Sequence, residues 1–186
     1  MGRYALLAAF VVGMGGCYRG NSRSVSLADV EREPGWLIVR GVPEVRQEKT
    51  HDCGAAALAM VLGRWGIPNA EREIQRVVPS SNEHGAQAGA LRQFARDEGL
   101  RAFLISGGPA DLEHELRAQR PVLVGLVQRY SGDRALTHYE VVIGLQPATG
   151  RVLLLDPARG PREDQLASFD QEWRAAGRLT LVVAPS

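Results

Sequence analysis

Residues 47–62 read QEKTHDCGAAALAMVL, a polar loop that runs directly into an apolar segment. From Cys53 to Trp65 the chain is apolar almost all round, which is typical of a buried helix. Asp52, just before this segment, is a residue type favoured at the N-cap. Gly66 followed by Pro68 is a helix stop signal. The stretch therefore predicts a buried helix that begins at a cysteine.

The position of Cys53 suits a nucleophile. Free N–H groups and the positive end of the helix dipole favour the thiolate at a helix N-terminus, and the thiolate is the reactive form. Gly54 and the alanines after it allow other groups to approach closely. A small buried core cysteine is the alternative, because a lone cysteine often has only that role.

The segments around this helix predict an α+β fold in which N-terminal helices pack on a C-terminal antiparallel sheet. Further helices are predicted over residues 71–78, 90–98 and 110–119, with a loop over 82–89. Strands are predicted over 36–39, 100–105, 121–128, 139–145, 152–156 and 179–183.

Composition excludes several classes of protein. The chain has 186 residues with 22 basic and 21 acidic side chains, so it lacks the positive charge that attracts nucleic acid. There is no G-x-x-x-x-G-K-[ST] phosphate loop. Two cysteines and four scattered histidines give no metal-ligand spacing, so no metal or cofactor is expected.

A thiolate nucleophile needs a base, and His138 is the best candidate among the four histidines. It opens an apolar strand, whereas His84 and His114 have polar neighbours that indicate surface positions. His51 lies two residues from Cys53 on a loop. The alternative for His138 is an ordinary loop histidine.

A predicted hairpin brings a carboxylate to His138. If the turn over 147–150 is centred near Pro147 and Ala148, facing residues have numbers that sum to 294 or 295, which places His138 opposite Asp156 or its neighbour. An Asp beside a His fixes the tautomer and stabilises the imidazolium. A shift of one residue would put the two side chains on opposite faces. The alternative for Asp156 and Pro157 is a simple strand-ending turn.

The N-terminus predicts an exported lipoprotein. Arg3 precedes an apolar run of signal-peptide length. Met14-Gly15-Gly16-Cys17 then resembles a bacterial lipoprotein cleavage box, which implies a signal peptide over 1–16 and a lipid on Cys17. The polar residues after it predict a flexible tether over 17–35. A plain secretory signal or an uncleaved anchor is the alternative.

The predicted lipid on Cys17 also bears on the location of the protein and on the pairing of Cys53. Tyr18 stands where an Asp would mark inner-membrane retention, so we expect the outer membrane of the cell envelope, facing the periplasm. A lipid on Cys17 leaves Cys53 without a disulfide partner. A disulfide between the two is the alternative in an oxidising compartment.

Together these residues resemble the bacteriocin-processing cysteine peptidase family, the papain-like domain that trims double-glycine leader peptides. The resemblance rests on Gln47, the run from Asp52 to Ala56, His138 ahead of its strand, and Asp156-Pro157-Ala158. It extends from about Val42 to about Gly177 and includes Gly85 to Leu100, Phe169 and Trp173. The peptidase domain is therefore expected over residues 36–186.

The resemblance implies a role for each matching residue. Cys53 would be the nucleophile, His138 the general base and acid, and Asp156 the residue that orients His138. Gln47 and the Cys53 N–H would bind the oxyanion. The expected substrate is an exported peptide or protein, possibly Gly-rich, and export machinery would be supplied by separate chains. A peptide-binding module without catalysis and a cell-wall amidase or isopeptidase remain alternatives.

One residue departs from the family pattern. Glu140 stands where the family commonly has an apolar residue after the histidine. By strand alternation it shares a face with His138. We therefore expect Glu140 to act on the base or to contact substrate.

Overall fold

The computed structural model describes residues 22–49, 51–81, 85–127 and 137–186. The predicted signal peptide over 1–16 and the lipidation site Cys17 lie outside the described residues. The helices are α1 (Leu27–Arg32), α2 (Cys53–Arg64), α3 (Glu71–Val77), α4 (Ala88–Asp97), α5 (Pro109–Arg117) and α6 (Leu166–Ala175). The strands are β1 (Arg23–Ser24), β2 (Leu37–Ile38), β3 (Ser80–Ser81), β4 (Gly85–Ala86), β5 (Arg101–Ser106), β6 (Val122–Val127), β7 (Thr137–Gln146), β8 (Arg151–Asp156), β9 (Gly160–Gln165) and β10 (Leu179–Ala184).

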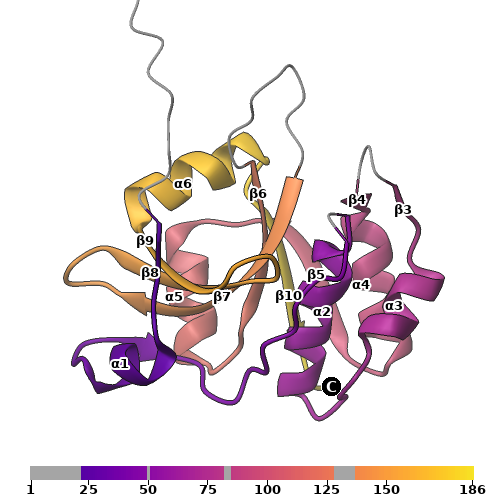
Figure 1. Cartoon of the computed structure of the whole chain (residues 1–186), viewed down its shortest axis with the longest axis horizontal. Helices are drawn as coiled ribbons and strands as arrows, with labels where there is room; N and C mark the ends of the chain where they lie inside the picture. The colour runs from indigo at the N-terminus through magenta and orange to yellow at the C-terminus, as the bar shows by residue number, and fades with distance from the viewer. Residues whose placement is uncertain (1–21, 50, 82–84, 128–136) are drawn as a thin grey trace, which may run out of the picture.

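The predicted α+β class is confirmed. The main sheet has the order β1-β9-β8-β7-β6-β10-β5, with β2 paired to β7, and every pairing in it is antiparallel. A separate small hairpin joins β3 and β4. Figure 1 shows α2, α3 and α4 gathered on one side of the molecule, with α6 and α1 on the other. Five of the six described helices precede β6, and most residues in strands lie from β6 onward, as expected.

Helix α2 is buried on every side, which explains its apolar sequence. It contacts β7 and β6 of the sheet and also α3 and α4. Every residue from Cys53 to Leu62 is buried. Its 12 residues are too few to span a bilayer, and in the described parts of the chain no helix combines the length and apolarity that a membrane crossing requires.

The predicted flexible tether over 17–35 is wrong from residue 22 onward. Strand β1 pairs with β9, and helix α1 buries Val30 in the core. Glu33, which follows α1, forms an ion pair with Arg151 of β8. The polar composition misled the prediction because backbone pairing, an ion pair and only a few apolar side chains hold this segment, which leaves little apolar periodicity in the sequence.

Strand β9 and helix α6 were not predicted. Strand β9 reads GPREDQ, yet Arg162, Glu163 and Asp164 are buried. Consecutive charged residues ordinarily indicate a solvated loop, so the sequence pattern pointed away from a strand. Helix α6 packs against β6, β8 and β9, and its Phe169 and Trp173 are fully buried with ring centroids 5.3 Å apart.

Candidate active site

Cys53 is the first residue of α2 and is a buried free thiol, 4% exposed. Asp52 occupies the N-cap position as predicted, but its side chain makes no cap hydrogen bond. Its Oδ2 instead accepts the Lys49 N–H at 3.1 Å. The Asp52 side chain therefore does not cap the first-turn N–H groups of α2 beside the thiol.

Gly54 allows the sheet to approach the cysteine, as its position suggested. A Cβ placed there would lie 2.8 Å from Ala86 Cβ and 3.2 Å from Tyr139 Cδ2. The Tyr139 hydroxyl donates to Ala86 O at 2.9 Å, which ties β7 to β4. Burial, followed by the nearby Cys53 charge, raises the pKa of Tyr139 to about 12. The side of β7 that carries Tyr139 thus packs directly on the start of α2.

His138 lies on the opposite side of β7 from Tyr139. A β-bulge between β7 and β8 sets which residues of β8 lie beside it. Next to the turn, Gln146 pairs with Arg151, but the register shifts between Val142 and Gly144, and beyond the shift Val142 pairs with Leu154. Paired numbers there sum to 296, which puts Asp156 level with Glu140. The predicted direct pairing of His138 with Asp156 is therefore wrong by two residues. Since two is even, both side chains still lie on the same face.

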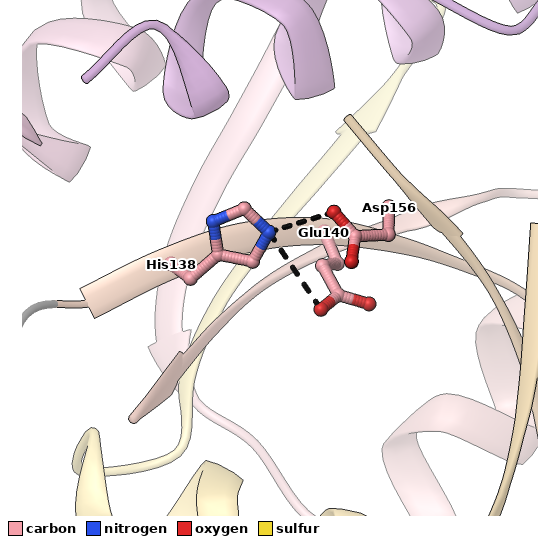
Figure 2. Close-up of side chains that lie close together, drawn as sticks. All are labelled: His138, Glu140 and Asp156. Atoms are coloured by element: carbon pink, nitrogen blue, oxygen red, sulfur yellow. Dashed lines mark hydrogen bonds and ion pairs between the residues drawn. The ribbon is translucent and has the colours of Figure 1, made fainter. Parts of the chain in front are cut away.

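His138 and Asp156 meet diagonally across the two strands. His138 Nε2 lies 2.8 Å from Asp156 Oδ1, and Figure 2 shows Nε2 directed at the carboxylates with the other ring nitrogen turned away. The Cys53 side chain is close enough to the ring to raise the pKa of His138. Because Nε2 takes the carboxylate, Nδ1 is the nitrogen left for the thiol.

The surroundings of His138 favour its charged form. Burial alone would lower its pKa, but the hydrogen bonds to Asp156 and Cys53 and the charges of Glu140 and Cys53 raise it to about 10. Burial would likewise raise the pKa of Asp156, but His138, the Arg159 guanidinium and the Ala158 N–H hold it well below its ordinary value. Arg159 Nε lies 2.6 Å from Asp156 Oδ2.

Gln47 is close in sequence to Cys53, and its backbone N–H donates to Pro157 O at 3.1 Å, directly after Asp156. Its side-chain Nε2 donates to Lys49 O at 3.0 Å. Its Oε1 is buried without a hydrogen-bond partner. The structure thus ties Gln47 to the strand end that carries Asp156, while its amide bonds the loop before Cys53.

The other two histidines that the structure describes, His51 and His114, take no part in this arrangement. His51 Nε2 lies 3.6 Å from Asp52 Oδ1, and His114 is exposed on α5. His84 lies outside the described residues. Among the histidines that the structure describes, only His138 has an interaction with Cys53.

Sequence reasoning missed a buried ion cluster beside His138. Arg162 of β9 binds both oxygens of Glu140, with Nε–Oε2 at 2.7 Å and Nη2–Oε1 at 2.9 Å. Arg162 also pairs with Asp164 at 3.4 Å and with Glu172 of α6 at 3.9 Å. The signals in the sequence were Glu140, expected on the same face as His138, and the three consecutive charged residues of β9, which a strand places alternately on two faces.

Three of these side chains could hold a metal ion by spacing alone. His138, Glu140 and Asp156 each offer a ligand atom within 4.8 Å of the others. However, Arg162 takes both oxygens of Glu140, and Arg159 and the Ala158 N–H take those of Asp156. Guanidinium groups thus supply the positive charge that a metal would supply, and the residues fit an ion-pair cluster better than a metal site.

The sequence model of the peptidase C39 family matches residues 42–186, which include every residue of the site. The chain belongs to the peptidase C39 family. A search of curated proteins gave no match. The family assignment confirms the resemblance to the bacteriocin-processing cysteine peptidases and, with it, the papain-like fold.

Solved C39 domains share the architecture. The chain is similar to a double glycine motif protease from an AMS/PCAT transporter, solved with the leader peptide (TM-score 0.62, 22% identity, 80% of this chain and 97% of that one). It is also similar to the peptidase domain of Streptococcus ComA, a bifunctional ABC transporter (TM-score 0.64, 24% identity, 78% of this chain and 99% of that one). A C39-like peptidase from Bacillus anthracis superposes with a TM-score of 0.68 at 18% identity, covering 81% and 98%. At these identities the likeness shows the fold alone.

Proposed function

We propose that this C39 domain is an active cysteine peptidase in which Cys53 is the nucleophile and His138 the base. The observation that carries the proposal is the position of the His138 ring, whose Nε2 lies 2.8 Å from Asp156 Oδ1 and whose pKa is raised by the nearby Cys53 side chain. A nucleophile, a base within reach of it and a carboxylate that orients the base are the three parts that acyl transfer needs.

In the acylation step, Cys53 Sγ attacks the peptide carbonyl carbon and the carbonyl π electrons move to oxygen. The tetrahedral intermediate collapses, the C–N bond breaks, and His138 Nδ1 gives its proton to the leaving amine. A thioester remains on Cys53. Water then loses a proton to His138 as it attacks the thioester, and the C–S bond breaks to release a carboxylic acid and the thiolate.

Two donors would stabilise the oxyanion in both steps. The Cys53 N–H lies in the uncapped first turn of α2, and the Gln47 amide is attached to the neighbouring loop. For this role the Gln47 amide exchanges its bond to Lys49 O for one to the oxyanion. Catalytic hydrogen bonds often form only in the complex with substrate, so the present bond to Lys49 is compatible with the role.

The substrate class we propose is an exported peptide or protein that binds in extended form, possibly Gly-rich. One similar structure is a double glycine motif protease in complex with the leader peptide, and another is the peptidase domain of an ABC transporter. By that likeness, export machinery in separate chains would deliver the substrate. No cofactor takes part in the chemistry that we propose.

We also propose that a lipid on Cys17 holds the domain at the cell envelope, in the outer membrane and facing the periplasm. The support is the sequence around Cys17 alone. The described chain starts at residue 22, and five residues reach at most about 18 Å. A lipid on Cys17 would therefore keep the domain beside the membrane. Labelling cells with an alkyne fatty acid, with Cys17→Ser as the control, tests the anchor.

A thiol-directed activity probe tests the peptidase proposal. The folded, reduced domain should be labelled on Cys53, and labelling should be lost in Cys53→Ala and fall strongly in His138→Ala. A peptide library should then give cleavage products with wild type and none with Cys53→Ala. If Cys53 stays unlabelled while the protein is folded, the proposal fails. Equal peptide binding by wild type and Cys53→Ala without turnover would indicate a binding module, and cleavage of cell-wall peptides alone would indicate an amidase.

A further inference from the structure

Glu140 places a second carboxylate beside His138, and it is fully buried, with 0% exposure. Its Oε1 lies 3.8 Å from His138 Nε2, the same nitrogen that bonds Asp156 Oδ1 at 2.8 Å. Figure 2 shows both carboxylates directed at that one nitrogen. A Cys-His-Asp mechanism needs only one of them, so Glu140 calls for its own explanation.

Arg162 fixes the position of Glu140. The guanidinium binds both carboxylate oxygens in a fork, and Arg162 itself is only 2% exposed. A bidentate pair of this kind specifies geometry as well as charge. Burying such a pair gives little net stability, because apolar residues of similar volume usually serve as well or better. The pair is therefore poorly explained as a stabilising element of the sheet.

Building on the proposed function, we propose that Glu140, held by Arg162, is a positioning residue for His138. Its charge stabilises the imidazolium and keeps Nε2 turned toward the two carboxylates. The ring then presents Nδ1 to Cys53 and retains the proton that the leaving amine requires. Glu140 acts through His138 and does not touch the reacting atoms.

The balance of neighbouring charges supports this role. Titratable and charged groups surround the pair of His138 and Glu140 on α2, β8, the turn after β8, β9 and α6: Cys53, Asp156, Arg159, Arg162, Asp164 and Glu172. Arg159 Nη2 lies 3.9 Å from Glu140 Oε1, so two guanidinium groups approach that carboxylate. Even with both arginines in place, the Glu140 charge raises the pKa of His138.

The test is an NMR titration of the His138 ring in 13C-histidine-labelled full-length protein, with the signal assigned by its loss in His138→Gln. In Glu140→Gln the deprotonation midpoint should move to lower pH by about one unit or more, since an opposite charge this close shifts a titration by that order. Because this variant takes the bidentate carboxylate from buried Arg162 and leaves it only the longer contacts to Asp164 and Glu172, it costs stability. The double variant Glu140→Gln/Arg162→Met is therefore measured beside it. The double variant should show the same direction of change.

Glu172→Gln is the matched control. It removes another buried carboxylate from Arg162, and no ion pair joins Glu172 to His138 in the described residues. Its midpoint should stay within about 0.3 units of wild type, well inside the shift expected from direct contact. Coinciding midpoints in wild type and the double variant, or an equal shift in Glu172→Gln, would overturn the inference.

The basic limb of Cys53 alkylation by iodoacetate provides a second readout. An anionic reagent is favoured by the imidazolium, so this limb should move to lower pH together with the His138 midpoint in both Glu140 variants. Neither readout needs a peptide substrate. If the midpoint moves but no peptide is cleaved, the proposed function is refuted and the effect of Glu140 on His138 is supported. If the midpoint does not move but the protein cleaves peptides, the role of Glu140 is refuted and the proposed function is supported.

Discussion

His138 Nε2 lies 2.8 Å from Asp156 Oδ1, and that carboxylate is held at the same time by the Ala158 N–H at 2.8 Å and by Arg159 Nε at 2.6 Å. Three donors converge on Asp156, which is fully buried. The carboxylate therefore has one position and one charge state, and His138 is oriented by a group that cannot move away from it.

Asp156→Asn should lower the rate of probe labelling and kcat by about 10²–10⁴-fold. The amide keeps the shape of the side chain but removes the charge that stabilises the imidazolium. Probe kinetics and circular dichroism check the result. Asp170→Asn is the control, since Asp170 pairs with Arg174 and Arg178 on and after α6. Labelling of a folded Asp156→Asn within threefold of wild type would contradict the role of Asp156.

The raised pKa of His138 predicts that the folded state loses stability in alkali. The pKa is about 10 in the folded protein against the ordinary value of 6.5. Because the folded value is the higher one, the stabilisation is fully present below pH 6.5 and is lost as the pH rises toward 10. Urea unfolding at pH 6, 8 and 10 should show this fall in the free energy of unfolding. His138→Gln should show a smaller fall, and equal falls would refute the coupling.

Gln47→Ala should lower kcat on the order of 100-fold and leave KM nearly unchanged, because an oxyanion donor acts mainly in the transition state. Alkylation of Cys53 by iodoacetamide should keep its wild-type rate, since alkylation forms no oxyanion. The control is Gln93→Ala, an exposed glutamine on α4 that bonds Asp97. Equal losses of turnover and alkylation would show that Gln47 acts on the thiol or the fold.

The sequence predicts well those helices and strands that are buried through apolar side chains. Helix α2 was predicted over 53–65 and runs from Cys53 to Arg64, and the hairpin turn falls at 147–150 as expected. The meeting of His138 with Asp156 was also predicted, although through a direct pairing that the register does not contain. The turn is centred between Ala148 and Thr149, later than assumed, and together with the bulge this leaves His138 and Asp156 an even number of residues from direct pairing, on the same face.

What could not be predicted depends on contacts between distant segments. Strand β9 contains charged residues that are buried with partners from other segments. Arg162 meets Glu140 and Glu172, and Glu163 meets Arg23 and Arg151. Strand β1 exists only because β9 offers it an edge. A local pattern contains neither fact, so both segments read as loops.

Removing residues 1–35 should lower the free energy of unfolding by about 2 kcal/mol, the order expected from exposing one buried aliphatic side chain. Val30 leaves the core, and Arg151 loses Glu33 and the Gln146 amide loses Pro34 O. Urea denaturation measures the difference. The protein that lacks only residues 1–21 keeps these contacts and is the reference for this difference. Equal stability of the two truncated proteins would restore the flexible-tether interpretation.

Two helical glycines should respond to the same substitution with opposite sign. In Gly54→Ala the new Cβ would lie 2.8 Å from Ala86 Cβ and 3.2 Å from Tyr139 Cδ2, so overpacking should cost about 1–3 kcal/mol. In Gly89→Ala of α4 a Cβ meets nothing within 4 Å, so the better helix propensity of alanine should stabilise by about 0.5–1 kcal/mol.

Urea unfolding of both glycine variants separates close packing from backbone propensity. Gly54→Ala should also slow probe labelling, because a displaced Tyr139 carries the adjacent His138 with it along β7. Gly89→Ala should label at the wild-type rate. Stabilisation by both substitutions would mean that α2 and β7 tolerate a wider separation than the structure shows, and the contact between Cys53 and His138 would then depend less on Gly54 than we infer.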